Sequence, residues 1–255
     1  MTRRPLLAAA ASLLAWPANA QAPRLRVLGT GAVENPLHEV ATGFMRETGR
    51  TVTLATGNGG QVASRVRDGE ALDVVINAAA TLDALIAEGH LDGTTRTELG
   101  RIRIGLAVRQ GSPAPDITTP DALRVALLAA PTIAHSDGGA GATTGRHILA
   151  MLDRLGIAAE VDARRRPFPR GLTAVQAVAE GRAAVVMTQI SEIVVVQGAT
   201  LVGPLPEELQ LVTPYVAAVA RRSGDPAGAR ALLAALSGAT GRTAFTAAGC
   251  SIDPG

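Results

Sequence analysis

Lysine is absent from this sequence of 255 residues, so every basic side chain except histidine is an arginine. This absence excludes Schiff-base chemistry and the lysine of a Walker-type phosphate clamp. Aromatic residues make up only 2% of the chain, and Trp16 is its single tryptophan. Nucleic-acid-binding surfaces combine clustered basic residues with aromatic side chains that stack on bases. We therefore expect no nucleic-acid partner.

Cysteine and histidine are also scarce. The single cysteine, Cys250, cannot form an internal disulfide, and we expect it to be a small buried hydrophobic residue. The four histidines are scattered, and none forms the i, i+4 pair of a zinc-binding helix. The sequence therefore predicts no metal site and no cofactor.

The N-terminal 20 residues have the three parts of a secretory signal peptide. A short basic start contains Arg3 and Arg4, an apolar run covers residues 6–16, and a small-x-small sequence ends at Ala20. We expect cleavage after Ala20 and a periplasmic protein, with general secretion favoured over twin-arginine export. The apolar run is shorter than the roughly 20 residues of a membrane-spanning helix, so no stable membrane insertion is expected.

Cleavage would leave a chain without net charge. The sequence has 24 basic and 22 acidic residues, and loss of Arg3 and Arg4 equalises the two counts at 22. A neutral protein of this size is large enough for one or two domains with substantial cores. We expect a monomer.

Strands and helices alternate along the chain, which predicts an α/β fold with mainly parallel sheets covered on both faces. The helix that follows the first strand is expected to have Asn35 as N-cap and Pro36 as its first residue. Strands are expected at residues 25–28, 51–55, 71–77, 131–134 and 183–187, and later helices at 61–67, 81–88, 120–129, 143–155, 172–178, 226–236 and 241–248.

Two longer alternating segments predict a division into two lobes. Residues 101–109 and 212–220 have the length of strands that cross between lobes. Residues 21–107 and 212–255 would then form the first lobe, and residues 108–211 the second. We expect the two strands to act as a hinge about which the lobes close.

A glycine-rich loop at residues 136–146 lies between a predicted strand and a predicted helix. Backbone N–H groups at a helix start, together with the helix dipole, form a natural site for a small anion. The loop lacks the lysine of a nucleotide-binding loop, so we expect it to contribute backbone amides near Thr143 and Thr144. A side chain at Gly141 or Gly145 should then disturb binding more than changes of the loop's existing side chains.

Similar strand-to-helix loops occur at residues 30–35, 58–61, 170–171 and 189–192. The ligand crevice of an open parallel sheet lies at the carboxyl ends of its strands. Such loops, facing one another across two lobes, would surround a small anion with N–H donors. The sequence therefore predicts a shared anion site between the lobes.

Several segments resemble the periplasmic molybdate-binding group, which are type II solute-binding proteins of ABC importers. They are Leu-Arg-Val-Leu-Gly-Thr-Gly-Ala-Val at 25–33, Asn-Gly-Gly-Gln at 58–61, residues 68–76, Gln-Ile-Ser-Glu-Ile at 189–193 and residues 201–210. The resemblance implies a two-lobed type II periplasmic-binding-protein fold and an importer permease as partner. It also implies a ligand site made of Thr30, Gly31, Ala32, Asn58, Gly59, Gly60, Thr143, Thr144, Arg170, Gly171 and Gln189.

The residues at these positions favour a ligand other than a tetrahedral oxyanion. By the resemblance, the family's two contact serines fall at Ala32 and Gly59, and its tyrosine donor at Gln189. Fewer hydroxyl donors weaken oxyanion recognition and leave more room. We expect a small organic carboxylate that pairs with Arg170 or Arg146, with molybdate as the other possibility. Residues 164–166, all arginine, are interpreted as a solvated face.

An enzymatic alternative uses the same scaffold. Some proteins similar to this group are thought to isomerise aconitate by proton abstraction next to a carboxylate, which needs a base in the cleft. The candidate bases are Glu34, Glu192, Asp137 and His38. The sequence does not separate this activity from binding alone.

Overall fold

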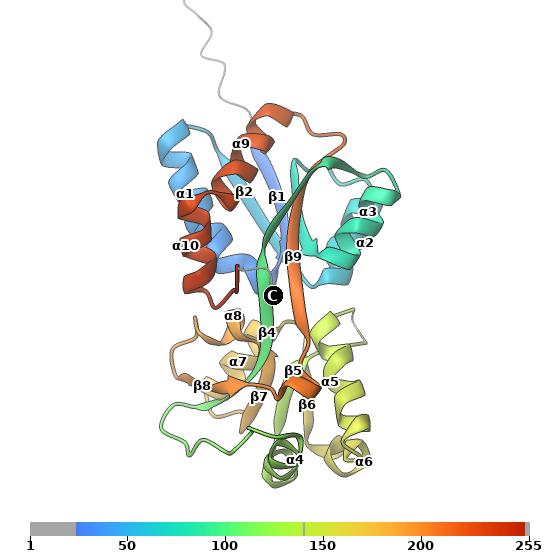
Figure 1. The fold of residues 1–255 in the computed structure, drawn as a ribbon, viewed down its shortest axis with the longest axis vertical. Helices are drawn as coiled ribbons and strands as arrows, with labels where there is room; N and C mark the ends of the chain where they lie inside the picture. The colour runs from blue at the N-terminus through green and yellow to red at the C-terminus, as the bar shows by residue number, and fades with distance from the viewer. Residues whose placement is uncertain (1–23, 140, 253–255) are drawn as a thin grey trace, which may run out of the picture.

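The computed structural model describes residues 24–139 and 141–252, so the signal-peptide prediction falls outside it. Figure 1 shows two lobes, one above the other, joined by the long strands β4 (Leu91–Arg109) and β9 (Val212–Ala220). Within these ranges the strands form a nine-stranded sheet of order β2-β1-β3-β9-β4-β7-β5-β6, with β8 paired to β4. In the described part of the chain, no helix is long and apolar enough to cross a membrane.

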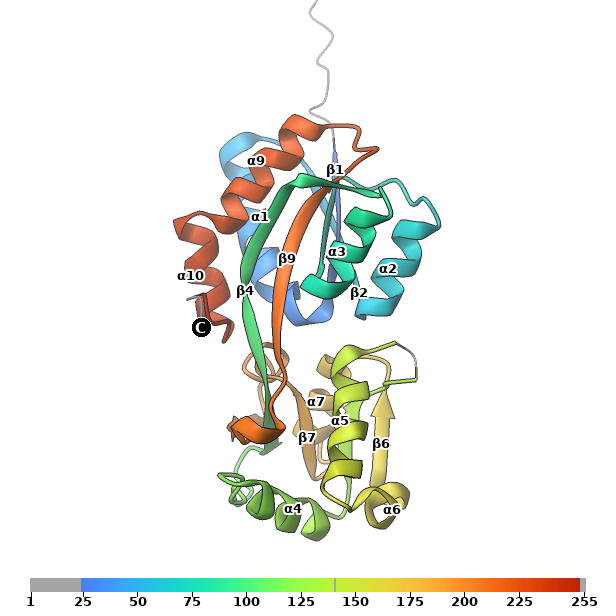
Figure 2. The same ribbon diagram turned by 45° about the vertical axis from the view of Figure 1, so that its right-hand side comes forward.

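The first lobe has a sheet of β2, β1, β3, β9 and β4 with helices on both faces (Figure 2). Strand β1 runs parallel to β2 and β3, whereas β9 is antiparallel to β3 and β4. Its other elements are β1 (Leu25–Thr30), a 3-10 turn η1 (Gly31–Val33), α1 (Glu34–Thr48), β2 (Val52–Gly57), α2 (Gly59–Arg67), β3 (Val74–Ala78), α3 (Ala79–Ala87), α9 (Pro226–Ser237) and α10 (Ala239–Ala247).

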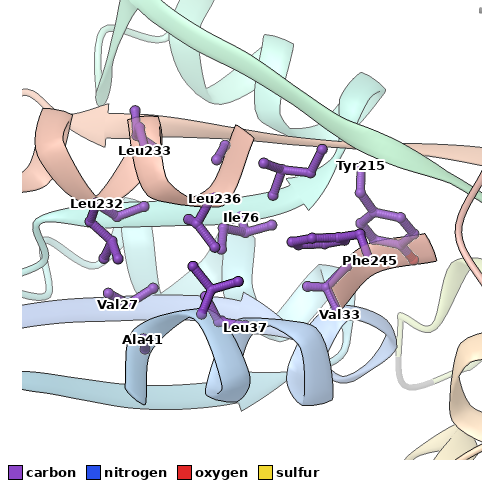
Figure 3. Close-up of a cluster of buried hydrophobic side chains, with 14 of the residues drawn as sticks. Val27, Val33, Leu37, Ala41, Ile76, Tyr215, Leu232, Leu233, Leu236 and Phe245 are labelled. Atoms are coloured by element: carbon purple, nitrogen blue, oxygen red, sulfur yellow. The ribbon is translucent and has the colours of Figure 1, made fainter. Parts of the chain in front are cut away.

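Alternation along the strands builds a core on each face of this sheet, because successive strand residues point to opposite faces. Val27 joins a cluster with Leu37 of α1 and with residues of α9 and α10, shown in Figure 3. Its neighbour Leu28 joins a second cluster beneath α2 and α3. Cys250 is buried in the first cluster, as predicted, and burial raises its pKa to about 12.

The second lobe repeats this plan around parallel pairs of β5 with β6 and with β7. Its core lies in two clusters, one under α4 and α5 and one under α7. Its elements are α4 (Pro120–Ala129), β5 (Ile133–Ser136), α5 (Thr143–Arg154), α6 (Ala158–Val161), η2 (Asp162–Arg164), β6 (Arg165–Phe168), α7 (Gly171–Ala179), β7 (Val185–Gln189), α8 (Ile190–Ile193), β8 (Ala199–Pro204) and η3 (Glu207–Leu209).

Strand β4 changes partners between Arg103 and Ile104. Up to Arg103 it pairs with β9, and from Ile104 it pairs with β7. The Gln210 side chain binds the backbone where the partners change: its Oε1 accepts from Ile104 N at 2.8 Å, and its Nε2 donates to Ile104 O at 3.0 Å. The predicted lobe boundary after residue 107 and the hinge motion stay predictions.

Two local predictions are wrong. Helix α1 begins at Glu34 with Val33 as N-cap, instead of using Asn35 as N-cap, because η1 runs directly into the helix. The arginine-rich segment contains strand β6, whose Pro167 is tolerated because β6 lies at the edge of the sheet. Arg164 is half-buried and donates to Leu128 O and Ala130 O at the C-terminal end of α4, so it is not simply a solvated charge.

We expect Asp73→Ala to lower the free energy of unfolding by about 2 kcal/mol, because it removes a buried acceptor of several hydrogen bonds. The Asp73 carboxylate accepts from Arg26 N at 2.7 Å, Ser223 Oγ at 2.7 Å and Gly224 N at 3.0 Å. It thereby ties the start of β1 to the turn after β9. Urea unfolding checks this, with exposed Asp68→Ala as the control. Equal midpoints for the two variants would contradict it.

Candidate functional site

A cavity lies between the lobes at the carboxyl ends of β1, β2, β3, β5, β6 and β7. These strand ends face one another because each lobe presents the same edge of its parallel strands to the other lobe. The structure brings all the predicted ligand residues except Gly60 to its lining, namely Thr30, Gly31, Ala32, Asn58, Gly59, Thr143, Thr144, Arg170, Gly171 and Gln189. Their role in binding stays a prediction.

Helices α2, α5 and α7 all begin at this lining, with Gly59, Thr143 and Gly171 as their first residues. The N-cap of α2, Asn58, accepts from Gln61 N at 2.9 Å. The N-cap residues of α5 and α7 make no side-chain capping hydrogen bond. The first N–H groups of a helix have no partner within the helix. Three helix starts thus place positive partial charge around the cavity.

Arg170 supplies a guanidinium in the cavity lining. It forms an ion pair with Glu34 of α1, which joins the two lobes, and its Nη2 donates to Thr56 Oγ1 at 3.2 Å. Its buried Nε has no hydrogen-bond partner among the described residues. Arg146, the other arginine considered for a carboxylate, lies outside the lining and is exposed.

Glu192 is a buried carboxyl group in the same lining. Its Oε2 accepts from Thr188 Oγ1 at 2.6 Å. A Cβ on Gly171 would lie 1.9 Å from this Oε2, so the carboxyl group rests directly on the start of α7. Burial raises the pKa of Glu192, against the opposing effects of Thr188 and Arg170. The group is therefore protonated over a wider pH range than an exposed glutamate.

The remaining candidate bases occupy different surroundings. Glu34 lies outside the lining and is connected to it through its ion pair with Arg170. The Asp137 carboxylate accepts from Gly139 N at 2.9 Å within its own loop and is not in the lining. His38 is exposed on α1, also outside the lining. Only Glu192 among the four candidates lines the cavity.

The glycine-rich loop between β5 and α5 packs closely against itself and against the first lobe. A Cβ on Gly145 would lie 2.2 Å from Ser136 O, so this glycine lets α5 approach the end of β5. Gly141 has a φ of +91°, a conformation that favours glycine. A Cβ on Gly60 would lie 3.3 Å from both Gly141 Cα and Gly141 O. Gly60 and Gly141 thus form a backbone contact between the lobes.

Three polar residues of the lining were not predicted as site residues from the sequence: Asn77, Ser136 and Tyr215. Asn77 is buried at the end of β3, and its Nδ2 donates to Gly59 O at 3.0 Å. The Gln189 Nε2 donates to Tyr215 Oη at 2.6 Å, and burial raises the pKa of that tyrosine. A polar residue that ends an apolar strand was a usable signal for Asn77 and Ser136. Tyr215 lies inside the apolar strand β9, so nothing in its local sequence indicates that it belongs to a site.

Ser136 and Tyr215 also correct the expectation that the cavity is poor in hydroxyl groups. Hydroxyls absent at Ala32 and Gly59 are supplied from β5 and β9 instead. Ser136 Oγ and Gln189 Oε1 are buried and have no hydrogen-bond partner among the described residues. Buried polar atoms without partners are costly, which marks the cavity as a place where a polar ligand would be stabilising. In the described ranges, no group of three or more His, Cys, Asp or Glu side chains could hold a metal ion.

Glu192→Gln is expected to stabilise the protein at alkaline pH. A carboxyl group whose folded pKa is raised stabilises the fold below its unfolded pKa, and this contribution is lost as pH rises through the folded pKa. Glutamine keeps an acceptor for Thr188 without the buried charge. We expect the variant to melt above the parent at pH 8, and the difference to shrink towards pH 4. A difference that stays constant with pH would contradict the raised pKa.

The family model of the bacterial extracellular solute-binding proteins matches residues 25–251. The chain belongs to this family. The match covers both lobes and the cavity between them, so the resemblance predicted from the sequence is confirmed for family and fold. The motif-by-motif assignment of ligand contacts stays a prediction.

Proteins similar to this solute-binding protein have different functions. An aconitate isomerase from a Pseudomonas species is 34% identical over 239 residues, which cover 91% of this chain and 90% of the relative. The periplasmic molybdate-binding protein of Azotobacter vinelandii has a TM-score of 0.77 at 19% identity, covering 90% of this chain and 100% of that one. The sulfate-binding protein SubI of Mycobacterium tuberculosis has a TM-score of 0.73 at 16% identity, with 91% and 88% covered. The two structural matches are matches of fold.

Proposed function

We propose that this solute-binding protein captures a small organic carboxylate between its two lobes, in the periplasm, as the receptor of an ABC importer. The observation that carries this proposal is that the Arg170 guanidinium lines the same cavity as the starts of α5 and α7, which have no side-chain caps. A guanidinium makes strong hydrogen bonds to carboxylates, so a ligand carboxylate fits the free Nε, whereas Nη2 already donates to Glu34 and Thr56. The buried Ser136 Oγ can donate to the carboxylate, and Gln189 Oε1, which can only accept, would take a hydrogen bond from a hydroxyl group or a protonated carboxyl group of the ligand.

Likeness to known proteins supports a carboxylate over a tetrahedral oxyanion. The relative with 34% identity over most of both chains is an enzyme of a tricarboxylate, aconitate. The molybdate-binding and sulfate-binding proteins share the fold at below 20% identity. We propose a monomer that presents its closed form to a permease, and export through the N-terminal signal peptide.

A thermal-shift panel of the purified protein tests the proposal. Its arms are cis-aconitate, trans-aconitate, citrate, succinate, molybdate, tungstate, sulfate and phosphate. A ligand at 100 times its Kd adds about 2.7 kcal/mol of stability, so a carboxylate should raise the melting temperature clearly. Stabilisation by molybdate or sulfate alone would move the assignment to an oxyanion, and no stabilisation by any anion would refute the receptor function.

Isomerisation of aconitate is the second candidate, because Glu192 places a carboxyl group with a raised pKa in the cavity. An ionised Glu192 would take a proton from the methylene carbon of cis-aconitate, and the resulting carbanion would be delocalised over the neighbouring double bond. Return of the same proton to the former vinyl carbon shifts the double bond and gives trans-aconitate. The step is redox-neutral and needs only a base and a clamp for the carboxylates, such as Arg170.

Proton NMR of cis-aconitate mixed with the purified protein tests this second candidate. Interconversion to trans-aconitate that is lost in Glu192→Gln would support the enzyme. Binding of aconitate without interconversion would exclude the isomerase and leave the receptor.

A further inference from the structure

We infer that the cavity takes up one proton together with each anion it binds, and that Glu192 receives this proton. The inference rests on the proposed capture of an anion at this site and specifies how the site tolerates its charge. It concerns three groups that meet between the lobes: Arg170, Glu34 and Glu192 (hereafter the Arg170 cluster).

Gly31, which has no side chain, lies against both Arg170 and Glu192. A Cβ on Gly31 would lie 3.2 Å from Arg170 Nη2 and 3.4 Å from Glu192 Oε1. Arg170 comes from the segment before α7, Glu192 from α8, and the ion-pair partner Glu34 from α1. One guanidinium therefore serves two carboxyl groups in the same small volume.

The charge of the Arg170 cluster is unfavourable for an anion. With both carboxyl groups ionised, the cluster carries one net negative charge, although it lies where the ligand is expected. A nearby negative charge disfavours ionisation of a carboxyl group, so binding of an anion favours protonation of one carboxyl group of the cluster. The protonated cluster is neutral, and its new O–H group can donate a hydrogen bond to the anion.

Glu192 is the group that accepts the proton, because it is the more deeply buried of the two. The Glu34 residue is half-buried and directly paired with the guanidinium, whereas the Glu192 residue is buried. The titratable or charged groups that face Glu192 in the described structure are Arg170 from the β6–α7 segment, Glu34 from α1 and Tyr215 from β9. Burial raises the pKa of Tyr215, so this group stays neutral, and Arg170 is the positive charge among the groups that face Glu192 in the described structure.

Binding and protonation are then linked. Affinity for an anion is highest below the pKa of Glu192 in the free protein. It falls about tenfold per pH unit up to the pKa of Glu192 in the complex, and is constant above that. Glutamine at 192 resembles the protonated group, so Glu192→Gln should bind with an affinity that no longer depends on pH.

Isothermal titration calorimetry with trans-aconitate tests the inference. Titrations at several pH values above 6, where the carboxylates of the probe are ionised, are run in two buffers with different ionisation enthalpies. At pH values between the pKa of Glu192 in the free protein and its pKa in the complex, we expect the parent to take up close to one proton per bound anion and Glu192→Gln to take up almost none. Glu39→Gln, which removes an exposed carboxylate from α1, is the matched control and should behave like the parent.

Each other outcome overturns a different statement. Binding by the parent without proton uptake at any of the pH values refutes the inference and leaves the proposed function intact. Uptake that persists in Glu192→Gln and disappears in Glu34→Gln assigns the proton to Glu34 instead. If neither trans-aconitate nor molybdate binds, the proposed function fails and the inference fails with it.

Discussion

Gly171→Ala is expected to weaken anion binding by at least about 100-fold and to destabilise the protein by about 3 kcal/mol, at the upper end for an overpacked core. The new Cβ would lie 1.9 Å from Glu192 Oε2 and 2.2 Å from Thr188 Oγ1. Both partners are buried and hydrogen-bonded to each other, so they cannot simply rotate away. The carboxyl group would have to leave the start of α7, and the cavity would change shape.

Urea unfolding and isothermal titration with trans-aconitate measure the two effects. Gly43→Ala is the matched control, because a Cβ on Gly43 meets no atom within 4 Å. Alanine in this helix interior should stabilise α1 by roughly 0.5–1 kcal/mol and leave binding unchanged. Parent-like binding by Gly171→Ala would show that Glu192 does not rest on α7 as described.

Gly60→Val is expected to weaken binding by about 100-fold, or about 2.7 kcal/mol, while leaving the melting temperature of the ligand-free protein close to that of the parent. A single Cβ would already lie 3.3 Å from Gly141 Cα and O, and the branches of valine need more room than this contact offers. Because Gly60 and Gly141 belong to different lobes, the substitution should hold the lobes apart without disturbing either core.

Small-angle X-ray scattering can follow this effect. With trans-aconitate added, the parent should become more compact and Gly60→Val should remain extended, with Gly43→Val as the control. Unchanged affinity in Gly60→Val would mean that the lobes need not approach as closely as in this structure.

Much of the fold could be predicted from local patterns in the sequence. Residues 120–129 and 212–220 were predicted with their exact bounds, since proline marks the start of α4 and a mainly apolar run of strand length marks β9. Strand β6 was missed because its proline and arginines argue against a strand. A proline is tolerated in an edge strand, but which strand lies at the edge is known only once the whole sheet is assembled.

The loops of the cavity could be predicted, but not the contacts between them. Each strand-to-helix loop has a local signature of glycine and polar residues, which explains why its position was predicted. The pairing of Arg170 with Glu34 joins residues 136 positions apart. Gln189 and Tyr215 meet across the sheet, 26 positions apart. Such contacts follow from how the lobes face each other, which no single segment encodes.

The most direct test of an anion site built around Arg170 is a calorimetric titration of three proteins with trans-aconitate. Arg170→Gln removes the guanidinium from the cavity, and Arg166→Gln removes an exposed one from the neighbouring strand β6. Loss of a charged hydrogen-bonding partner typically costs 2–5 kcal/mol. We expect the parent and Arg166→Gln to bind one anion with equal affinity and Arg170→Gln to show no measurable binding. Equal binding by all three proteins would contradict the site.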